Sequence, residues 1–340
     1  MDNILVFGFG VASSSYISLL DHNKKKVSVI GTPYDLKKIR LFQKTYNKKK
    51  YQSELSFSKN ILFFEKLNTN NIPDYSLIII GVNSNGISWA AEQLRKLKKT
   101  CTILILTKGL HKEKNKVITM SDYFLLNTKF KNIVSAAGPC LAKELIKKTH
   151  TRTVLASSKI ENAKFVKKIL ENDYYHPDIT SDIKGAEICA AIKNIYATLI
   201  GAATGQSNNY LTAYEKNKYH FNAASALFEQ SLREMLIIIK KYNGLTSTVM
   251  GPAGAGDLYV SALGGRNSKM GSFLGKGNLY KKIISSQMKG VTIEGAELML
   301  DVGSILLRIV GQTKLPLAAL LYKVITKNKK LVIDWKKFIN

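Results

Sequence analysis

The first half of the chain alternates short apolar runs with polar, helix-like segments. The runs are rich in β-branched residues and continuous rather than alternating; they cover residues 4–7, 27–30, 61–64, 77–81, 102–106, 133–136 and 153–157. Strands that are buried on both faces of a parallel sheet show this pattern, because crossover helices cover both faces. The first half therefore predicts an α/β domain built on a Rossmann-like, doubly wound parallel sheet.

The pattern changes near Asp182. From residue 184 onward the apolar positions recur with helical spacing, and long helices are expected over residues 185–203, 221–242, 295–310 and 317–326. The polar segment 204–220 reads as a loop or an interrupted helix. We expect two domains, residues 1–183 with the sheet and residues 184–340 as an all-α domain.

A glycine turn follows the first predicted strand directly. Residues 8–13 read GFGVAS and lead into the helical segment 14–20. Gly8 allows a tight turn, Gly10 allows a pyrophosphate to approach the start of the helix, and Ser13 is small enough for close helix–strand packing. A strand, glycine turn and helix at this place predict dinucleotide binding; the alternative is a plain strand–helix turn.

The end of the second strand leaves the choice between NAD and NADP open. An acid there would hold the ribose hydroxyls and an arginine would hold a 2′-phosphate. The chain has Gly31, Thr32 and Pro33 instead, and Asp35 lies further along. The basic residues at 37, 38 and 40 favour NADP slightly, but they equally suit a solvated helix surface.

Two charged residues stand alone in long uncharged stretches of the second half. Lys193 is the only formally charged residue between positions 188 and 214, and Asp257 is the only one between 242 and 265. A lysine on a small, apolar helix face is expected to be buried, and burial lowers the pKa of an amine, which suits proton transfer. The buried carboxylate needs a cation or several N–H donors, so we expect the two side chains to pair. The alternatives are a structural lysine and a helix-capping aspartate.

Two further places suit an anion. Lys108 follows the strand predicted over residues 102–106, and ligands of doubly wound sheets lie beyond the carboxyl ends of strands. Arg266 and Asn267 follow two glycines, which suits a phosphate but also a turn.

Composition excludes several other classes. The formal net charge is +27, but 45 of the 51 basic residues are lysines spread along the chain, whereas nucleic-acid recognition favours clustered arginine; no nucleic-acid partner is expected. No apolar run reaches the roughly 20 residues that span a bilayer, and no secretory signal is evident. Three scattered cysteines favour a reducing compartment, and hence the cytoplasm, and no metal-ligand cluster occurs. The sequence leaves a homodimer open.

In their order and spacing the motifs resemble the bacterial-type NAD(P)-dependent glycerol-3-phosphate dehydrogenase family. The resemblance spans about residues 3 to 326 and rests on GFG at 8–10, TKGL at 107–110, AGPCLA at 137–142, GAEICAAIKN at 185–194, NAA at 222–224, LREM at 232–235, GAGDL at 254–258, RN at 266–267 and IEG at 293–295. It implies interconversion of dihydroxyacetone phosphate and sn-glycerol 3-phosphate with NAD or NADP, supplying glycerophospholipid synthesis.

The resemblance also implies roles for individual residues. Lys193 would donate and accept the proton, with Asp257 beside it. The phosphorylated substrate would be bound by Lys108, Gly138, Cys140, Lys193, Asp257, Arg266 and Asn267. The cofactor would be bound by Gly8, Gly10, Val11, Ala12, Lys108, Ala142, Arg266 and Glu294.

Several positions depart from the family pattern. The glycine turn continues with Val11, Ala12 and Ser13 rather than Ser, an aromatic residue and Gly. Cys140 replaces a small hydroxyl residue, the usual arginine after the second strand is replaced around Thr32, and Gln230 stands where an arginine is expected. The loop over residues 208–220 is longer than usual. The alternatives are a β-hydroxyacid dehydrogenase or ketopantoate reductase, which share this architecture, and a non-catalytic relative.

Overall fold

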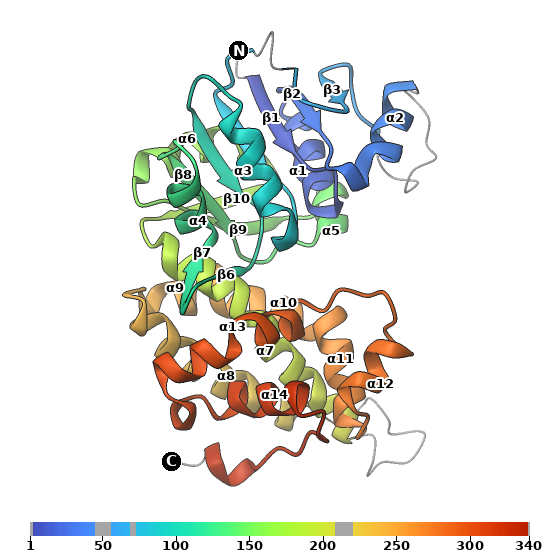
Figure 1. The fold of residues 1–340 in the computed structure, drawn as a ribbon, viewed down its shortest axis with the longest axis vertical. Coiled ribbons are helices and arrows are strands. Elements are labelled where there is room, and N and C mark those ends of the chain that lie inside the picture. Colours follow the sequence, from blue (N-terminus) through green and yellow to red (C-terminus); the bar gives the residue numbers. More distant parts are fainter. Residues whose placement is uncertain (1–2, 45–55, 69–72, 208–219, 339–340) are drawn as a thin grey trace. The chain divides into compact units, whose positions relative to one another are not determined.

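The computed structural model describes residues 3–44, 56–68, 73–207 and 220–338. The chain forms two compact units, one of Met1–Lys108 with Met120–Ala186 and one of Gly109–Thr119 with Glu187–Asn340 (Figure 1). The segment 109–119, within the range expected for the first domain, therefore belongs to the second unit. Of the polar segment 204–220, the first residues complete a helix that ends at Ser207, and residues 208–219 lie outside the described residues.

An eight-stranded sheet forms the centre of the first unit. Its order is β10-β9-β8-β5-β4-β1-β2-β3, so the chain order reverses between β1 and β4, as in doubly wound sheets. The strands are β1 (Asn3–Phe7), β2 (Lys26–Ile30), β3 (Ile61–Phe64), β4 (Leu77–Ile80), β5 (Thr102–Ile105), β8 (Ile133–Ala137), β9 (Thr151–Ala156) and β10 (Tyr175–Thr180).

The sheet departs from the predicted one in two ways. The strands β8 and β9 pair antiparallel, so the expectation of an all-parallel sheet was wrong at that pair, although β9 and β10 are parallel. No apolar run marks β10 in the sequence, because this edge strand carries Pro177 and the polar residues His176, Asp178 and Thr180. Proline is tolerated in an edge strand, where one row of N–H groups pairs with nothing in the sheet.

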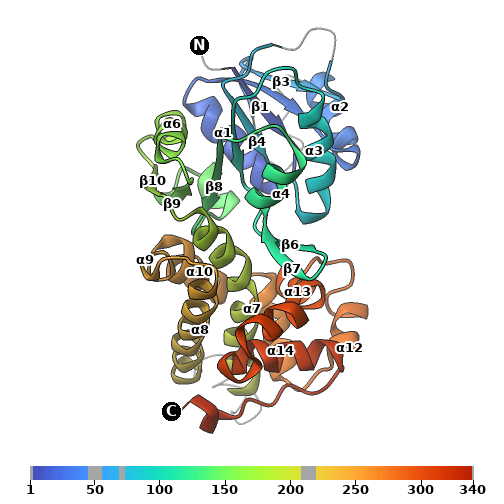
Figure 2. The ribbon, with the colours of Figure 1, turned by 60° about the vertical axis from the view of Figure 1, so that its left-hand side comes forward.

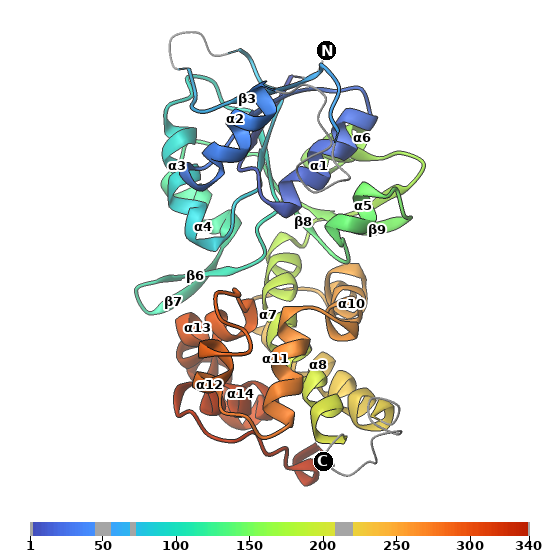
Figure 3. The same cartoon turned by 90° about the vertical axis from the view of Figure 1, so that its right-hand side faces the viewer.

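Helices cover both faces of this sheet, as Figure 3 shows. One face packs on α1 (Val11–His22), α2 (Leu36–Lys44), α5 (Ala142–Ile146) and α6 (Ile160–Leu170). The other face packs on α3 (Ile87–Arg95) and α4 (Met120–Asn127). The inner strands are apolar on both sides because both sides are buried, which is why their pattern was continuous.

In its described residues the second unit is helical apart from one hairpin. The hairpin, β6 (Leu110–Glu113) with β7 (Lys116–Thr119), packs against α13 (Figure 2). Arg308 of α13 donates to the carbonyl oxygen of Asn115 at 3.2 Å. The helices are α7 (Ile183–Ser207), α8 (Phe221–Lys241), α9 (Thr246–Met250), α10 (Asp257–Leu263), α11 (Arg266–Gly275), α12 (Tyr280–Ser285), α13 (Glu294–Val310) and α14 (Pro316–Thr326). The four long helices predicted from periodicity are α7, α8, α13 and α14.

The helix α7 is the core of the second unit. In the described part of the chain it is the one helix long and apolar enough to cross a membrane, but 94% of its most apolar window is buried inside the protein. Its apolar surface is therefore covered by neighbouring helices.

Glycines let α7 and α11 cross at backbone contact. A Cβ atom added to Gly271 would lie 1.8 Å from the carbonyl oxygen of Thr198, and one added to Gly201 would lie 2.2 Å from that of Ser268. About one helical turn before this contact in both helices, Asn267 of α11 donates to the side-chain oxygen of Asn194 in α7 at 3.1 Å. The glycine contact thus holds the start of α11 beside the part of α7 that carries Lys193.

Candidate active site

The glycine turn lies between β1 and α1 and leaves open space above Gly10. Gly8 has a φ of +92°, and a Cβ atom there would lie 2.7 Å from the carbonyl oxygen of Gly81, so both conformation and packing require glycine. A Cβ atom at Gly10 would meet nothing within 4 Å. Ser13 is buried and donates to the carbonyl oxygen of Gly81 at 2.7 Å, which packs α1 closely on the end of β4, as its small size predicted.

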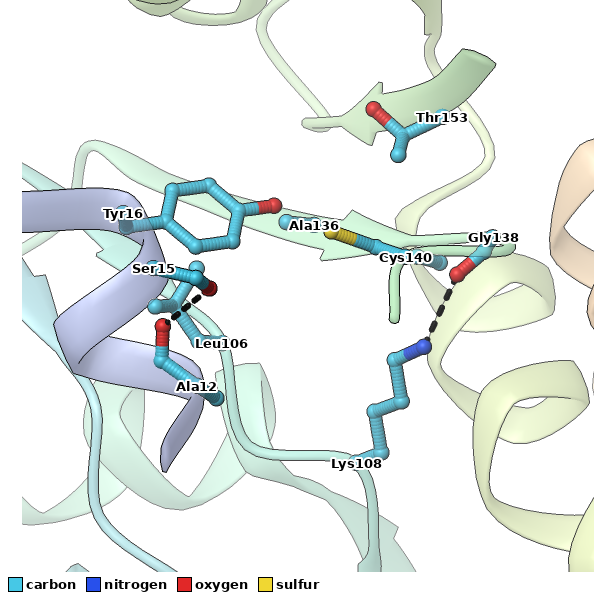
Figure 4. Close-up of a pocket in the computed structure, with 10 residues that line it drawn as sticks. Ala12, Ser15, Tyr16, Leu106, Lys108, Ala136, Gly138, Cys140 and Thr153 are labelled. Atoms are coloured by element: carbon cyan, nitrogen blue, oxygen red, sulfur yellow. Dashed lines mark hydrogen bonds between the residues drawn. The ribbon is translucent and has the colours of Figure 1, made fainter. Parts of the chain in front are cut away.

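A small pocket of the first unit lies at the carboxyl ends of the strands. Figure 4 shows Lys108 reaching towards Gly138, and its Nζ donates to the Gly138 carbonyl oxygen at 2.8 Å. Gly138 has a φ of +102°, which favours glycine. The pocket is lined by Ala12, Ser15, Tyr16, Leu106, Lys108, Ala136, Ala137, Gly138, Cys140 and Thr153. Ala142, predicted to line the cofactor, begins α5 just after this segment.

One wall of that pocket is a buried hydroxyl network. The hydroxyl groups of Tyr16 and Tyr175 lie 2.9 Å apart, and Thr153 donates to Tyr175 at 2.9 Å. Burial, with Tyr175 and Cys140 adding to it, raises the pKa of Tyr16 well above its ordinary value, so this phenol stays neutral. The side chain of Cys140 therefore faces a neutral hydroxyl, in the direction that Figure 4 shows.

Lys193 and Asp257 form a buried ion pair in the second unit. Lys193 Nζ lies 2.5 Å from Asp257 Oδ1, and their side chains are 8% and 3% exposed. Lys193 Nζ also donates to Ser261 Oγ at 2.8 Å. The residues on the same face of α7, from Ala186 to Ile200, are buried, as the apolar pattern indicated. The two charges isolated in the sequence do lie together, and the aspartate also begins a helix.

The local backbone places the carboxylate. A π-helical turn over Pro252–Gly256 precedes α10, and Asp257 is the first residue of α10. A Cβ atom at Gly254 would lie 2.1 Å from the carbonyl oxygen of Val249, so the tight turn depends on that glycine. Ser261 lies one helical turn after Asp257, so both side chains reach the amine from α10.

A second polar cluster lies at the start of α11. Arg266 forms an ion pair with Glu294, and Asn267 donates to Glu294 Oε2 at 3.3 Å. Asn267 also accepts from the Gly295 amide at 2.9 Å. With Asn194 as a further partner, the Asn267 side chain is engaged within the protein. Within the described residues no side chain caps the amino end of α11, which therefore presents its first backbone N–H groups.

The predicted site residues thus fall in two sets. The first unit holds the glycine turn with Lys108, Gly138, Cys140 and Ala142; the second holds Lys193, Asp257, Arg266, Asn267 and Glu294. Sequence reasoning missed Ser261, Asn194 and the Tyr16–Tyr175 pair. Serine, asparagine and tyrosine carry no formal charge, so their positions in the sequence give no signal like that of an isolated lysine or aspartate.

The glycine turn fits a dinucleotide. The backbone at Gly10 is open to a ligand, since an added Cβ atom meets nothing within 4 Å, and no side chain of the described residues caps the first backbone N–H groups of α1. Amide groups at a helix start, together with the helix dipole, bind anions. Val11, the first residue of α1, is 59% exposed.

Family models match both halves of the chain. The NAD-dependent glycerol-3-phosphate dehydrogenase N-terminus matches residues 3–163, and the C-terminus of the same family matches residues 182–333.

Curated relatives and a solved structure are also similar to this chain. A glycerol-3-phosphate dehydrogenase [NAD(P)+] of Lactiplantibacillus plantarum is 28% identical, covering 87% of this chain and 85% of the relative. An NADP(+)-dependent glycerol-3-phosphate dehydrogenase of Archaeoglobus fulgidus is 26% identical, covering 81% and 80%. The fold matches the crystal structure of glycerol-3-phosphate dehydrogenase from Coxiella burnetii with a TM-score of 0.82 at 21% identity, over 99% of this chain and 98% of that one. The chain therefore belongs to the NAD-dependent glycerol-3-phosphate dehydrogenase family and is an NAD(P)-dependent oxidoreductase.

Proposed function

We propose that this chain interconverts dihydroxyacetone phosphate and sn-glycerol 3-phosphate, with Lys193 as the proton donor and acceptor. The observation that carries the proposal is the buried Lys193–Asp257 pair with Ser261 at its side. The dinucleotide, when bound, supplies or accepts the hydride. Residues of this chain would bind the substrate, stabilise the developing charge and transfer the proton.

Lys193 would stabilise the negative charge that develops on the substrate oxygen. When the ketone carbon is reduced, negative charge grows on its oxygen, and a nearby ammonium stabilises that charge and gives its proton. Asp257 and Ser261 accept hydrogen bonds from the amine and fix its position. A low-dielectric surrounding strengthens this effect because water does not screen the charges.

The phosphate of the substrate needs cations and N–H donors. In the second unit we assign this role to Arg266 and to the uncapped amino end of α11. In the first unit we assign it to Lys108, as the sequence predicts. Since the Asn267 side chain is engaged by Asn194, Glu294 and Gly295, Asn267 would contribute its backbone N–H. Gly138 and Cys140 would shape the pocket beside Lys108.

The dinucleotide is assigned to the glycine turn. Its pyrophosphate would bind at the amino end of α1 beside Gly8, Gly10, Val11 and Ala12. Lys108, Ala142, Arg266 and Glu294 complete the set that we assign to the cofactor.

We also propose a cytoplasmic enzyme whose product supplies glycerophospholipid synthesis. Three free cysteines suit a reducing compartment. Size-exclusion chromatography with light scattering decides between a monomer and a homodimer.

The Lys193→Ala variant tests the central assignment. We expect kcat for dihydroxyacetone phosphate to fall by at least about a thousandfold, because both charge stabilisation and proton donation are lost. Nicotinamide binding, measured by fluorescence titration, should survive. Lys184→Ala is the matched control, since Lys184 lies in the same helix with its side chain 52% exposed. Near-normal turnover in the Lys193 variant would remove the assignment.

A further inference from the structure

A buried carboxylate lies beside the glycine turn, at the end of β2. Asp35 closes the 3-10 turn Pro33–Asp35 that follows β2, and the residue is only 8% exposed. Its Oδ2 accepts from the Phe9 amide at 3.1 Å, the Thr32 amide at 3.0 Å and the Thr32 hydroxyl at 2.7 Å. Phe9 is the middle residue of the glycine turn. Asp35 therefore ties the loop after β2 to the loop that we assign to the dinucleotide.

Gly31 leaves the space that the Asp35 side chain occupies. Gly31 directly follows β2, where doubly wound dehydrogenases carry the residue that distinguishes NAD from NADP. A Cβ atom at Gly31 would lie 2.9 Å from Asp35 Cβ and 2.7 Å from Ile39 Cγ1. A side chain at position 31 would thus displace Asp35. Because position 31 has none, Asp35 folds back and brings its carboxylate to the end of β2.

One oxygen of Asp35 remains for a ligand. The described residues make three hydrogen bonds to this carboxylate, and all three use Oδ2. A few polar side-chain atoms of the described residues are fully buried and lack a hydrogen-bond partner, and Asp35 Oδ1 is not one of them. We propose that Asp35 makes this chain selective for NAD over NADP, with Oδ1 accepting from a ribose hydroxyl of the adenosine half. This inference rests on the proposed dinucleotide site at Gly8–Gly10. A carboxylate in this position repels a 2′-phosphate, and the repulsion is strong where water is partly excluded.

The basic residues that follow do not reverse this expectation. Arg40 is the residue of this segment best suited to grip a phosphate, but its guanidinium makes two hydrogen bonds of 2.9 Å to the Glu65 carboxylate. The remaining cations, Lys37 and Lys38, lack the planar fork of arginine, and Lys37 is exposed to solvent. The carboxylate of Asp35 is fixed by three donors, whereas a lysine must be ordered before it binds a phosphate.

Binding of the reduced cofactors tests the proposal without turnover. The dissociation constants of NADH and NADPH are measured on the full chain by nicotinamide fluorescence and by calorimetry. For the natural sequence we expect NADH to bind at least tenfold more tightly than NADPH. In Asp35→Asn this ratio should fall at least tenfold, because the amide keeps an oxygen for Phe9 and Thr32 but loses the negative charge.

The control is Asp74→Asn, which removes the same charge from an exposed ion pair with Lys99 in the same unit; its ratio should not change. Equal binding of NADH and NADPH by the natural sequence overturns the selectivity proposal while leaving the dinucleotide site intact. An unchanged ratio in a folded Asp35→Asn protein removes Asp35 as its cause. Binding of neither cofactor overturns the glycine-turn site itself, and the selectivity proposal with it.

Discussion

At the residue scale, a charged residue that stands alone in an uncharged stretch of sequence proved to be buried and paired with an opposite charge. Lys193 and Asp257 stand 64 residues apart, and each is the only formal charge in its stretch. Burying one charge alone is costly, so two buried charges of opposite sign in one unit are expected to meet. Other buried charged residues are not isolated in this way; one is Glu234, which has Arg233 and Glu229 near it in the sequence.

Glu234 gives the stability of the protein a pH dependence. Its carboxylate accepts from the amides of Leu317 at 2.6 Å and Ala318 at 3.0 Å, at the start of α14, and from the Tyr196 hydroxyl at 3.2 Å. Burial raises the pKa of Glu234 to about 7, although these hydrogen bonds oppose the shift. Between the ordinary pKa of 4.5 and about 7 the folded protein holds a proton that the unfolded chain releases. The contribution of Glu234 to stability is therefore complete below the lower value and is lost as the pH rises through the upper one.

We predict that Glu234→Gln removes this dependence. The amide does not titrate, so the unfolding free energy of the variant, relative to the natural sequence, should rise by up to roughly 3 kcal/mol between about pH 5 and pH 8. Urea unfolding across that range measures it. Glu229→Gln, an exposed position of the same helix paired with Arg233, should follow the natural sequence. Parallel pH profiles for Glu234→Gln and the natural sequence would contradict the assignment.

At the element scale, periodicity found the long helices and the central strands but not the elements with mixed patterns. The edge strand β10 and the hairpin β6–β7 are short and largely polar on one side, so their sequences resemble loops. The close crossing of α7 and α11 was also invisible. Four glycines allow this crossing, at positions 201, 205, 271 and 275. In the sequence alone, each of them is equally typical of a turn or of a helix end.

Gly271→Ala should disrupt this crossing. Its new methyl group would lie 1.8 Å from the Thr198 carbonyl oxygen, so the two helices must separate. We expect a loss of about 3 kcal/mol or more in unfolding free energy, at the upper end of overpacking effects. Gly264→Ala is the control, because a Cβ atom there meets nothing within 4 Å and its φ of 176° suits any residue. Denaturant unfolding of both variants checks this; equal stability would show that the crossing yields without cost.

At the scale of the whole molecule, the net charge of +27 acts over a distance that single contacts do not reach. A positive field raises the local concentration of an anionic substrate, and salt screens that field over a Debye length of about 10 Å at 0.1 M. We expect kcat/KM for dihydroxyacetone phosphate to fall at least threefold as ionic strength rises from about 10 to 150 mM. Dihydroxyacetone, which lacks the phosphate, should show little change. A salt-independent kcat/KM for the phosphorylated substrate would mean that the lysines only solvate the surface.

The sequence by itself determined the fold class, the cofactor class and the family. Each follows from local information: the period of the apolar positions, a glycine turn between a strand and a helix, and ordered motifs such as GAGDL. Only the tertiary structure decided the antiparallel β8–β9 pair, the place of the β6–β7 hairpin, the Ser261 contact and the return of Asp35 to the glycine turn. These depend on which segments meet in space. Strand direction, glycine contacts and the partners of uncharged polar groups leave little trace in the composition of either segment alone.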